Sequence, residues 1–203
     1  MEATKKYELS NITIEFNGVT LHRIKALKDF SNVKAGDLGG WVEKEDNLSQ
    51  IDDAWIDENA KVYGNAQICG NVIVFDDAII YDNAEVYGNA QICGKAQVFG
   101  NARIYDNAEI YGKSMVYGDA QVYGRARISG DASVRCGADY IIFKNFWSSG
   151  RFFTWTRSNN MWSVGCFYGT GEELIRKAYK DSETSGKEYE RVVRYVDSIL
   201  ANK

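Results

Sequence analysis

The sequence predicts a mainly β protein: a parallel β-helix with an N-terminal β-hairpin cap and a small C-terminal α+β module. Three observations predict it. An aliphatic residue recurs every six positions over residues 56–134, Asn17-Gly18 separates two strand-like segments, and two amphipathic segments follow residue 170. We expect three parts, a cap at 1–50, the repeats at 51–138 and the module at 139–203.

The repeat accounts for the largest part of the chain. Every sixth residue from Ile56 to Val134 is Ile or Val, and a small side chain, mostly Ala, follows four positions later. Neither the helical period of 3.6 nor simple strand alternation fits this pattern. A short strand followed by a tight Gly or Asp turn does fit it, with the aliphatic residue and the Ala pointing inward. Three such sides make one coil of about 18 residues, so the hexads predict about four to five stacked coils.

Aromatic residues follow nine of the aliphatic positions and should point outward. Spaced three hexads apart, they should form ladders on adjacent coils. Such rings either support one another or form a surface for a partner, and the sequence leaves both interpretations open. The nine residues are Tyr63, Phe75, Tyr81, Tyr87, Phe99, Tyr105, Tyr111, Tyr117 and Tyr123.

Residues 7–27 are predicted to cover the open end of the first coil. Two β-rich segments flank Asn17-Gly18, a pair typical of two-residue hairpin turns. The edge of a coil stack must be covered, so a capping role follows. His22, the single histidine of the chain, lies in this hairpin, and we expect a structural role for it.

After Val134 the hexads stop and a module of three strands and two helices is predicted. Thr170 with Glu173, and Ser185 with Glu188, have the spacing of capping boxes and should open the two helices. The expected strands are 140–147, 151–157 and 161–168, and the expected helices are 171–181 and 186–200.

This module contains the predicted ligand site. Residues 140–171 include ten aromatic and three basic residues but no Asp or Glu. Strand alternation should place Arg151, Phe153, Trp155 and Arg157 on one face, where rings could stack and guanidinium groups could bind phosphate. Free N–H groups at the helix start near Thr170 could add an anion site. The predicted ligand-binding set is Arg151, Phe153, Trp155, Arg157, Trp162, Tyr168 and Thr170. The alternative is that the aromatic residues form the core of the module.

The segment IYDNAEVYGNAQICGKAQVFGNARIYDNAEIYG resembles left-handed β-helix proteins built from hexapeptide repeats. RIKALKDFSNVKAGDLGGWVEKEDNLSQ (23–50) and FFTWTRSNNMWSVGCFYGTGEEL resemble the cap and the tail of phage and prophage members, which are usually labelled transferases or polymer-forming proteins. The resemblance implies a homotrimer. It also implies that an acyltransferase would use a His in or near the coils, and that a carbonic anhydrase would need three His. This chain has no His after residue 22, which excludes the second activity and disfavours the first.

Composition limits the remaining classes. The chain has a net charge of −4, no proline, one His and four cysteines without a CxxC pair. We expect a cytoplasmic protein of a bacterial host, without a signal peptide, a membrane span, a metal, a cofactor or an extended nucleic-acid partner.

The predicted function is a non-catalytic, phage-type oligomer that sequesters a small anionic, nucleotide-like molecule, in effect an anti-defence protein with no catalytic residue. One alternative is a structural or adaptor trimer that presents its C-terminal module to another protein. A second alternative is a hexapeptide-family acyltransferase that uses His22 or a carboxylate as its base.

Overall fold

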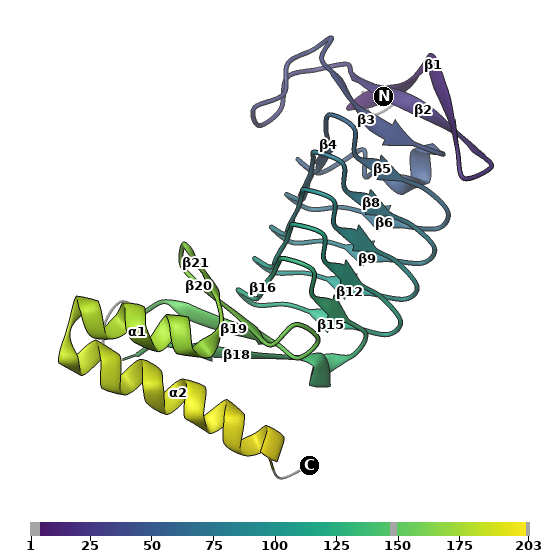
Figure 1. Ribbon diagram of the computed structural model, residues 1–203. Coiled ribbons are helices and arrows are strands. Elements are labelled where there is room, and N and C mark those ends of the chain that lie inside the picture. Colours follow the sequence, from purple (N-terminus) through teal and green to yellow (C-terminus); the bar gives the residue numbers. More distant parts are fainter. Residues whose placement is uncertain (1–4, 147–149, 202–203) are drawn as a thin grey trace.

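The computed structural model describes residues 5–146 and 150–201, and it has the predicted architecture (Figure 1). Fourteen two-residue strands wind into a parallel β-solenoid with three flat sheets. Face A contains β5 (Lys61–Val62), β8 (Ile79–Ile80), β11 (Gln97–Val98), β14 (Met115–Val116) and β17 (Ser133–Val134). Face B contains β4 (Trp55–Ile56), β7 (Ile73–Val74), β10 (Gln91–Ile92), β13 (Glu109–Ile110) and β16 (Arg127–Ile128). Face C contains β6 (Gln67–Ile68), β9 (Glu85–Val86), β12 (Arg103–Ile104) and β15 (Gln121–Val122).

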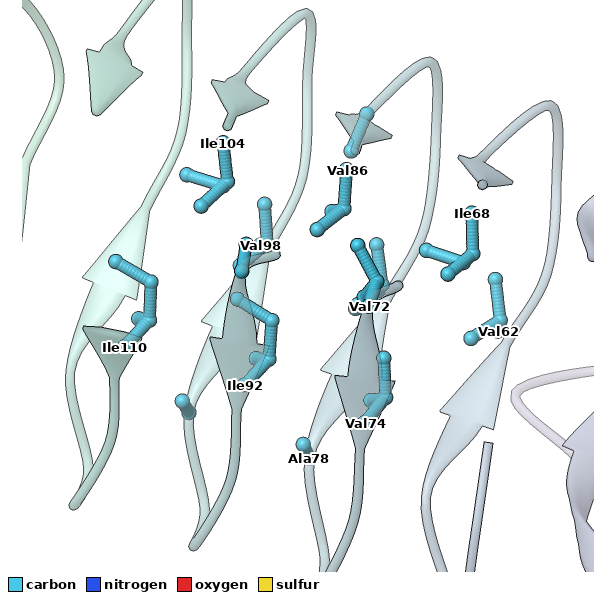
Figure 2. Packing of buried hydrophobic residues seen from close by; sticks show 14 of the residues in the cluster. Val62, Ile68, Val72, Val74, Ala78, Val86, Ile92, Val98, Ile104 and Ile110 are labelled. Atoms are coloured by element: carbon cyan, nitrogen blue, oxygen red, sulfur yellow. The ribbon is translucent and has the colours of Figure 1, made fainter. Parts of the chain in front are cut away.

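The interior of the solenoid follows the hexad pattern. Ile and Val of successive coils stack on the axis, and the small residue of each hexad, mostly Ala, is buried beside them (Figure 2). The small Ala side chain lets the three faces approach closely at each corner. The inward assignment of both positions is therefore confirmed.

Backbone hydrogen bonds run in one direction along the stack. Lys61 N donates to Ala78 O at 2.9 Å and Tyr63 N donates to Ile80 O at 3.0 Å, and this pattern repeats coil after coil. The N-terminal end of the stack therefore presents carbonyl groups without a partner coil, and the C-terminal end presents N–H groups. Buried groups of both kinds must find other partners.

Backbone N–H groups of Trp41, Glu43 and Ser49 satisfy some of the first carbonyls, and side chains supply further partners at both ends. At the N-terminal end, the buried Lys6 Nζ donates to Asp52 O at 2.7 Å and to Ala54 O at 2.8 Å. At the C-terminal end, Arg127 N donates to Thr154 Oγ1 at 3.0 Å and Ser133 N donates to Ser158 Oγ at 2.7 Å. The two caps thus have opposite chemistry, donors at one end and acceptors at the other.

Asp replaces Gly at several turns of the solenoid. Asp76 and Asp106 have φ of 57° and 59°, in the left-handed region. Their carboxylates reach the next coil, where Asp76 Oδ2 accepts from Gly94 N at 2.9 Å and Asp106 Oδ2 accepts from Gly124 N at 3.1 Å. These bonds offset the dihedral strain of a non-glycine residue.

The N-terminal hairpin is formed as predicted. β1 (Tyr7–Phe16) and β2 (Val19–Ala26) are joined at Asn17 and Gly18, whose φ values of 52° and 80° fit a type I′ turn. β3 (Leu38–Val42) pairs antiparallel with β2 and parallel with β5, so the hairpin extends face A into an eight-stranded sheet. The short 3-10 helix η1 (Glu45–Asn47) follows.

The C-terminal module differs from the prediction in two places. After η2 (Gly137–Asp139), four antiparallel strands form, β18 (Tyr140–Lys144), β19 (Phe152–Thr156), β20 (Met161–Val164) and β21 (Phe167–Gly169). The predicted single strand 161–168 is divided because Gly165, at φ 57°, turns the chain.

The second difference concerns the last helix. α1 (Gly171–Asp181) begins at Thr170 as expected, but α2 (Glu183–Ala201) begins three residues before the predicted start. The Ser182 hydroxyl, and not that of Ser185, receives an N–H bond at the helix start, from Ser185 N at 3.1 Å. Among the described residues, no helix has the length and apolar character that a membrane crossing requires.

Candidate functional site

Three of the predicted ligand-binding residues form the core of the module. Phe153, Trp155 and Trp162 are 0%, 1% and 2% exposed, and the Phe153 ring packs edge-on against Trp162 with 6.4 Å between centroids. The sheet is covered on one face by the last coil and on the other by α1 and α2 (Figure 1). The expected ring-and-guanidinium face does not form, and the core interpretation of these rings is correct.

The remaining predicted residues are dispersed. Arg157 is exposed, and its backbone N donates to Asp139 O at 2.8 Å. The Tyr168 hydroxyl accepts from Asn159 Nδ2 at 3.1 Å and lies close to Gly130. Arg151 is also exposed, but it lies at a different edge of the module, which is described below. The structure therefore does not bring the predicted set together.

The helix start at Thr170, which was expected to bind an anionic ligand, already binds the carboxylate of Glu173. Thr170 N and Thr170 Oγ1 donate to Glu173 Oε2 at 2.9 and 3.0 Å. The bond from the Thr170 backbone, more than any other contact, lowers the pKa of the Glu173 carboxyl. The N–H group that would have bound a ligand is thus satisfied within the capping box.

Arg151 instead lines a groove between the solenoid and the module, which we call the junction groove. Its floor is the C-terminal end of face B, and its wall is formed by the start of β19 and the turn between β20 and β21. The lining residues are Asn107, Glu109, Arg125, Arg127, Gly150, Arg151, Phe152 and Gly165. The solenoid itself has no long inserted loop, so the module supplies the wall.

The junction groove is strongly basic in a chain of net negative charge. The guanidinium of Arg125 lies 5.5 Å from the centre of the Phe152 ring, and Lys144 Nζ lies 5.9 Å from the same ring. Within the described ranges 5–146 and 150–201, Arg125, Lys144 and Arg151 form no ion pair. Two uncompensated cations beside an aromatic ring, with a third on the same wall, are suited to an anionic ligand with a planar group.

Arg127 connects the two sides of the groove. Its Nε donates to Glu109 Oε2 at 2.7 Å, its guanidinium lies 5.4 Å from the centre of the Tyr111 ring, and one of its terminal nitrogens donates to Gly165 O. This arginine fixes the Glu109 carboxylate on face B and holds the turn of the wall. Glu109 is the one carboxylate among the described residues that line the groove.

Sequence reasoning found Arg151 and missed the groove residues on the solenoid. A signal was present, because the outward residues of face B change along the stack from Trp55 and Ile73 through Gln91 to Glu109 and Arg127. Periodicity alone could not show that the module packs beside the charged end of this row.

The remaining candidate groups lie outside the groove. His22 is half-buried in β2, with Nδ1 3.4 Å from Ser10 O. Burial raises the pKa of the Cys69 and Cys93 thiols, which disfavours the reactive thiolate form. Over the described part of the chain, no group of three or more His, Cys, Asp and Glu side chains could hold a metal ion.

The stacked coils of short parallel strands define a β-solenoid protein of the hexapeptide-repeat class, as the sequence resemblance implied. A family model described as "YdcK Beta solenoid repeat" matches residues 66–81, 96–112 and 120–135. The chain is also 40% identical over 76 residues to the "Uncharacterized acetyltransferase YdcK" of Escherichia coli (strain K12). That match covers 33% of this chain and 23% of the relative, so the chain spans about a quarter of the relative's length.

These similarities correct one expectation. The prediction that the chain is not an enzyme is contradicted, because the relative is named as an acetyltransferase. The single histidine therefore does not justify assigning a purely non-catalytic role. The comparisons also give no support to a phage origin or to a sequestering role.

Proposed function

We propose that this protein is an acyltransferase whose junction groove binds an anionic, nucleotide-bearing thioester donor of the coenzyme A type. The observation that carries the proposal is the basic groove, with Arg125 and Lys144 beside the Phe152 ring and Arg151 on the wall, on a solenoid similar to one named as an acetyltransferase. The nucleotide-like ligand expected from the sequence thus becomes the acyl donor, and of the residues predicted to bind it only Arg151 lines the groove.

Recognition would rest on charge and stacking. Arg125 and Arg151 can each present two N–H groups to one phosphate. Both guanidinium groups are exposed to solvent in the free protein, so they are accessible to a ligand. Phe152 offers a ring to the planar base or to the apolar arm of the donor. Because Lys144 and Arg125 already lie near that ring, a phosphate beside it would meet both cations.

Transfer requires a group that accepts a proton from the acceptor. Glu109 is the candidate, because it is the one carboxylate among the described lining residues and its Oε2 is held by Arg127 Nε at 2.7 Å. The acceptor nitrogen or oxygen would bond to the acyl carbon while the carbon–sulfur bond breaks. The acceptor proton would pass to Glu109 and then to the departing thiolate, so charge and atoms balance.

The first test is equilibrium binding of coenzyme A and acetyl-coenzyme A by calorimetry. Arg125→Ala and Arg151→Ala should each weaken binding about 10- to 100-fold, the loss expected for a charge-assisted hydrogen-bonding group. Arg103→Ala is the matched control, because Arg103 is also an exposed solenoid arginine but pairs with Glu85 on face C.

The second test is thiol release from acetyl-coenzyme A with a panel of amine and hydroxyl acceptors. Glu109→Gln should bind the donor and lose turnover. Absence of donor binding by the wild-type chain, or equal binding by the Arg125→Ala, Arg151→Ala and Arg103→Ala variants, would refute the assignment of the groove.

A further inference from the structure

The C-terminal module contains a small cavity that does not involve the solenoid faces. It lies between the turn that joins β20 and β21 and the helices α1 and α2, which cover one side of the sheet (Figure 1). We call it the module cavity, and its volume is about 70 Å³. Since a dry cavity of about 150 Å³ holds benzene, which has six carbon atoms, this one has room for about three.

The inner wall of the module cavity is apolar. It consists of the buried side chains of Val164, Leu174 and Ala178 and the half-buried ring of Phe167. These residues lie on β20, α1 and β21, so both the sheet and a helix contribute. A wall of this composition favours an aliphatic group, because burial of apolar surface is favourable.

One polar group in the module cavity lacks a hydrogen-bond partner. Tyr189, on α2, lines the cavity and is 9% exposed, with its ring packed edge-on against Phe153. Its hydroxyl forms no hydrogen bond with any described residue. A buried hydroxyl without a partner carries a desolvation cost, so a ligand that supplies an acceptor oxygen is favoured.

The mouth of the module cavity has a net positive charge. Arg151, Lys177 and Asp181 line it, all three are exposed, and none forms an ion pair within residues 5–146 and 150–201. The Arg151 side chain lies against Gly165, where a Cβ would be 3.6 Å from its Cδ. Two cations against one carboxylate favour an anionic group at the mouth.

We propose that the module cavity binds a short-chain aliphatic carboxylate, such as butyrate, with its three-carbon chain inside and its carboxylate at the mouth. Arg151 and Lys177 can form charge-assisted hydrogen bonds with the carboxylate, and the Tyr189 hydroxyl can donate to one of its oxygens. Arg151 also lines the junction groove, but binding of a carboxylate requires no thioester donor. The proposal is therefore independent of the proposed acyl transfer.

Asp181 gives the proposal a test of charge. Its carboxylate repels an anion at the same mouth, so Asp181→Asn should strengthen butyrate binding about two- to tenfold. Propylamine is the matched ligand control, because it has the same three-carbon chain with the opposite charge and should not bind. Tighter binding of propylamine or of 2-aminobutyrate than of butyrate would contradict the assignment of a simple carboxylate.

An NMR titration of the full-length, ¹⁵N-labelled chain with sodium butyrate at constant ionic strength tests binding. Because so small a ligand binds weakly, the titration should extend to about 20 mM. The amide signals of Cys166 and Ala178 should shift and saturate. Affinity should rise from acetate to butyrate and fall at least about tenfold at octanoate, whose chain exceeds the cavity. Absence of saturation, or affinity that keeps rising with chain length, would overturn the proposal.

Substitutions locate the site. Arg151→Gln should weaken butyrate binding at least about tenfold, and Tyr189→Phe about three- to tenfold, because each removes a donor to the carboxylate. Arg157→Gln is the matched control, since Arg157 is an exposed arginine of the same module that does not line the cavity. Unchanged binding by Tyr189→Phe, or an equal loss by Arg151→Gln and Arg157→Gln, would refute the assignment. The coenzyme A titrations test the junction groove separately, so either result can fail without the other.

Discussion

The glycines at the solenoid turns allow a test of how closely the coils pack. Gly88 and Gly124 have similar backbone conformations, with φ of 76° and 69°. A Cβ added at Gly88 would lie 2.8 Å from Asp106 N and 3.0 Å from Asp106 O in the next coil. A Cβ added at Gly124 would meet nothing within 4 Å. The two alanine substitutions therefore share the dihedral strain and differ in the backbone clash.

The magnitudes follow from that difference. A left-handed alanine costs about 1–2 kcal/mol, and the stiffer unfolded chain returns about 0.4–1 kcal/mol, so Gly124→Ala should lose about 1 kcal/mol. Gly88→Ala must also displace backbone of the neighbouring coil, which adds about 1–3 kcal/mol. We therefore expect a loss of about 2–4 kcal/mol at Gly88.

Urea denaturation followed by circular dichroism measures both changes. At this chain length each kcal/mol also lowers the melting temperature by about 2–4 °C. If the two variants lose equal stability, the coil-to-coil clash is not the reason for glycine at these turns. The dihedral requirement alone would then explain the repeat.

Three further predictions concern the caps and the core. Burial lowers the pKa of Lys6 from 10.5 to about 8, so the unfolded chain holds this proton more tightly. The free energy of unfolding should then rise with pH between about 8 and 10.5, and a titration of Lys6→Met should lack that rise. Thr154→Val keeps the shape but leaves Arg127 N without its acceptor, and should cost about 1–3 kcal/mol in urea denaturation. Trp155→Ala should lose about 3–5 kcal/mol of stability and, where folded, should bind coenzyme A like the wild type in calorimetry, because its ring is core.

The fold was predictable because its determinants are local and repeated. Each hexad places one aliphatic residue and one small residue, mostly Ala, inward, and the turn residue permits the corner, so the pattern over residues 56–134 specifies the coils without long-range information. The hairpin at Asn17-Gly18 and the start of α1 at Thr170 were predictable for the same reason. The start of α2 was not, because both Ser182 and Ser185 have the chemistry of a cap.

The site was less predictable because it depends on packing between distant segments. Strand alternation correctly predicts which residues of β19 share a face. It cannot predict that one face is covered by α1 and α2 and the other by the last coil. Phe153 and Trp155 face α1 and α2, while Thr154 faces the last coil. The basic lining residues of the groove come from positions 125, 127 and 151, Lys144 lies beside the Phe152 ring, and only the docked module brings them together.

The direction of the backbone hydrogen bonds explains why a groove forms at this end of the solenoid. The last coil presents N–H groups, so a stable chain end needs acceptors, and Thr154 and Ser158 supply them from the module. A sheet that supplies acceptors to the last coil must lie across its end, and its turns then extend beside face B. The wall of the junction groove is thus a consequence of capping the stack. Loss of the cap should therefore weaken ligand binding as well as stability, because both depend on the same docked sheet.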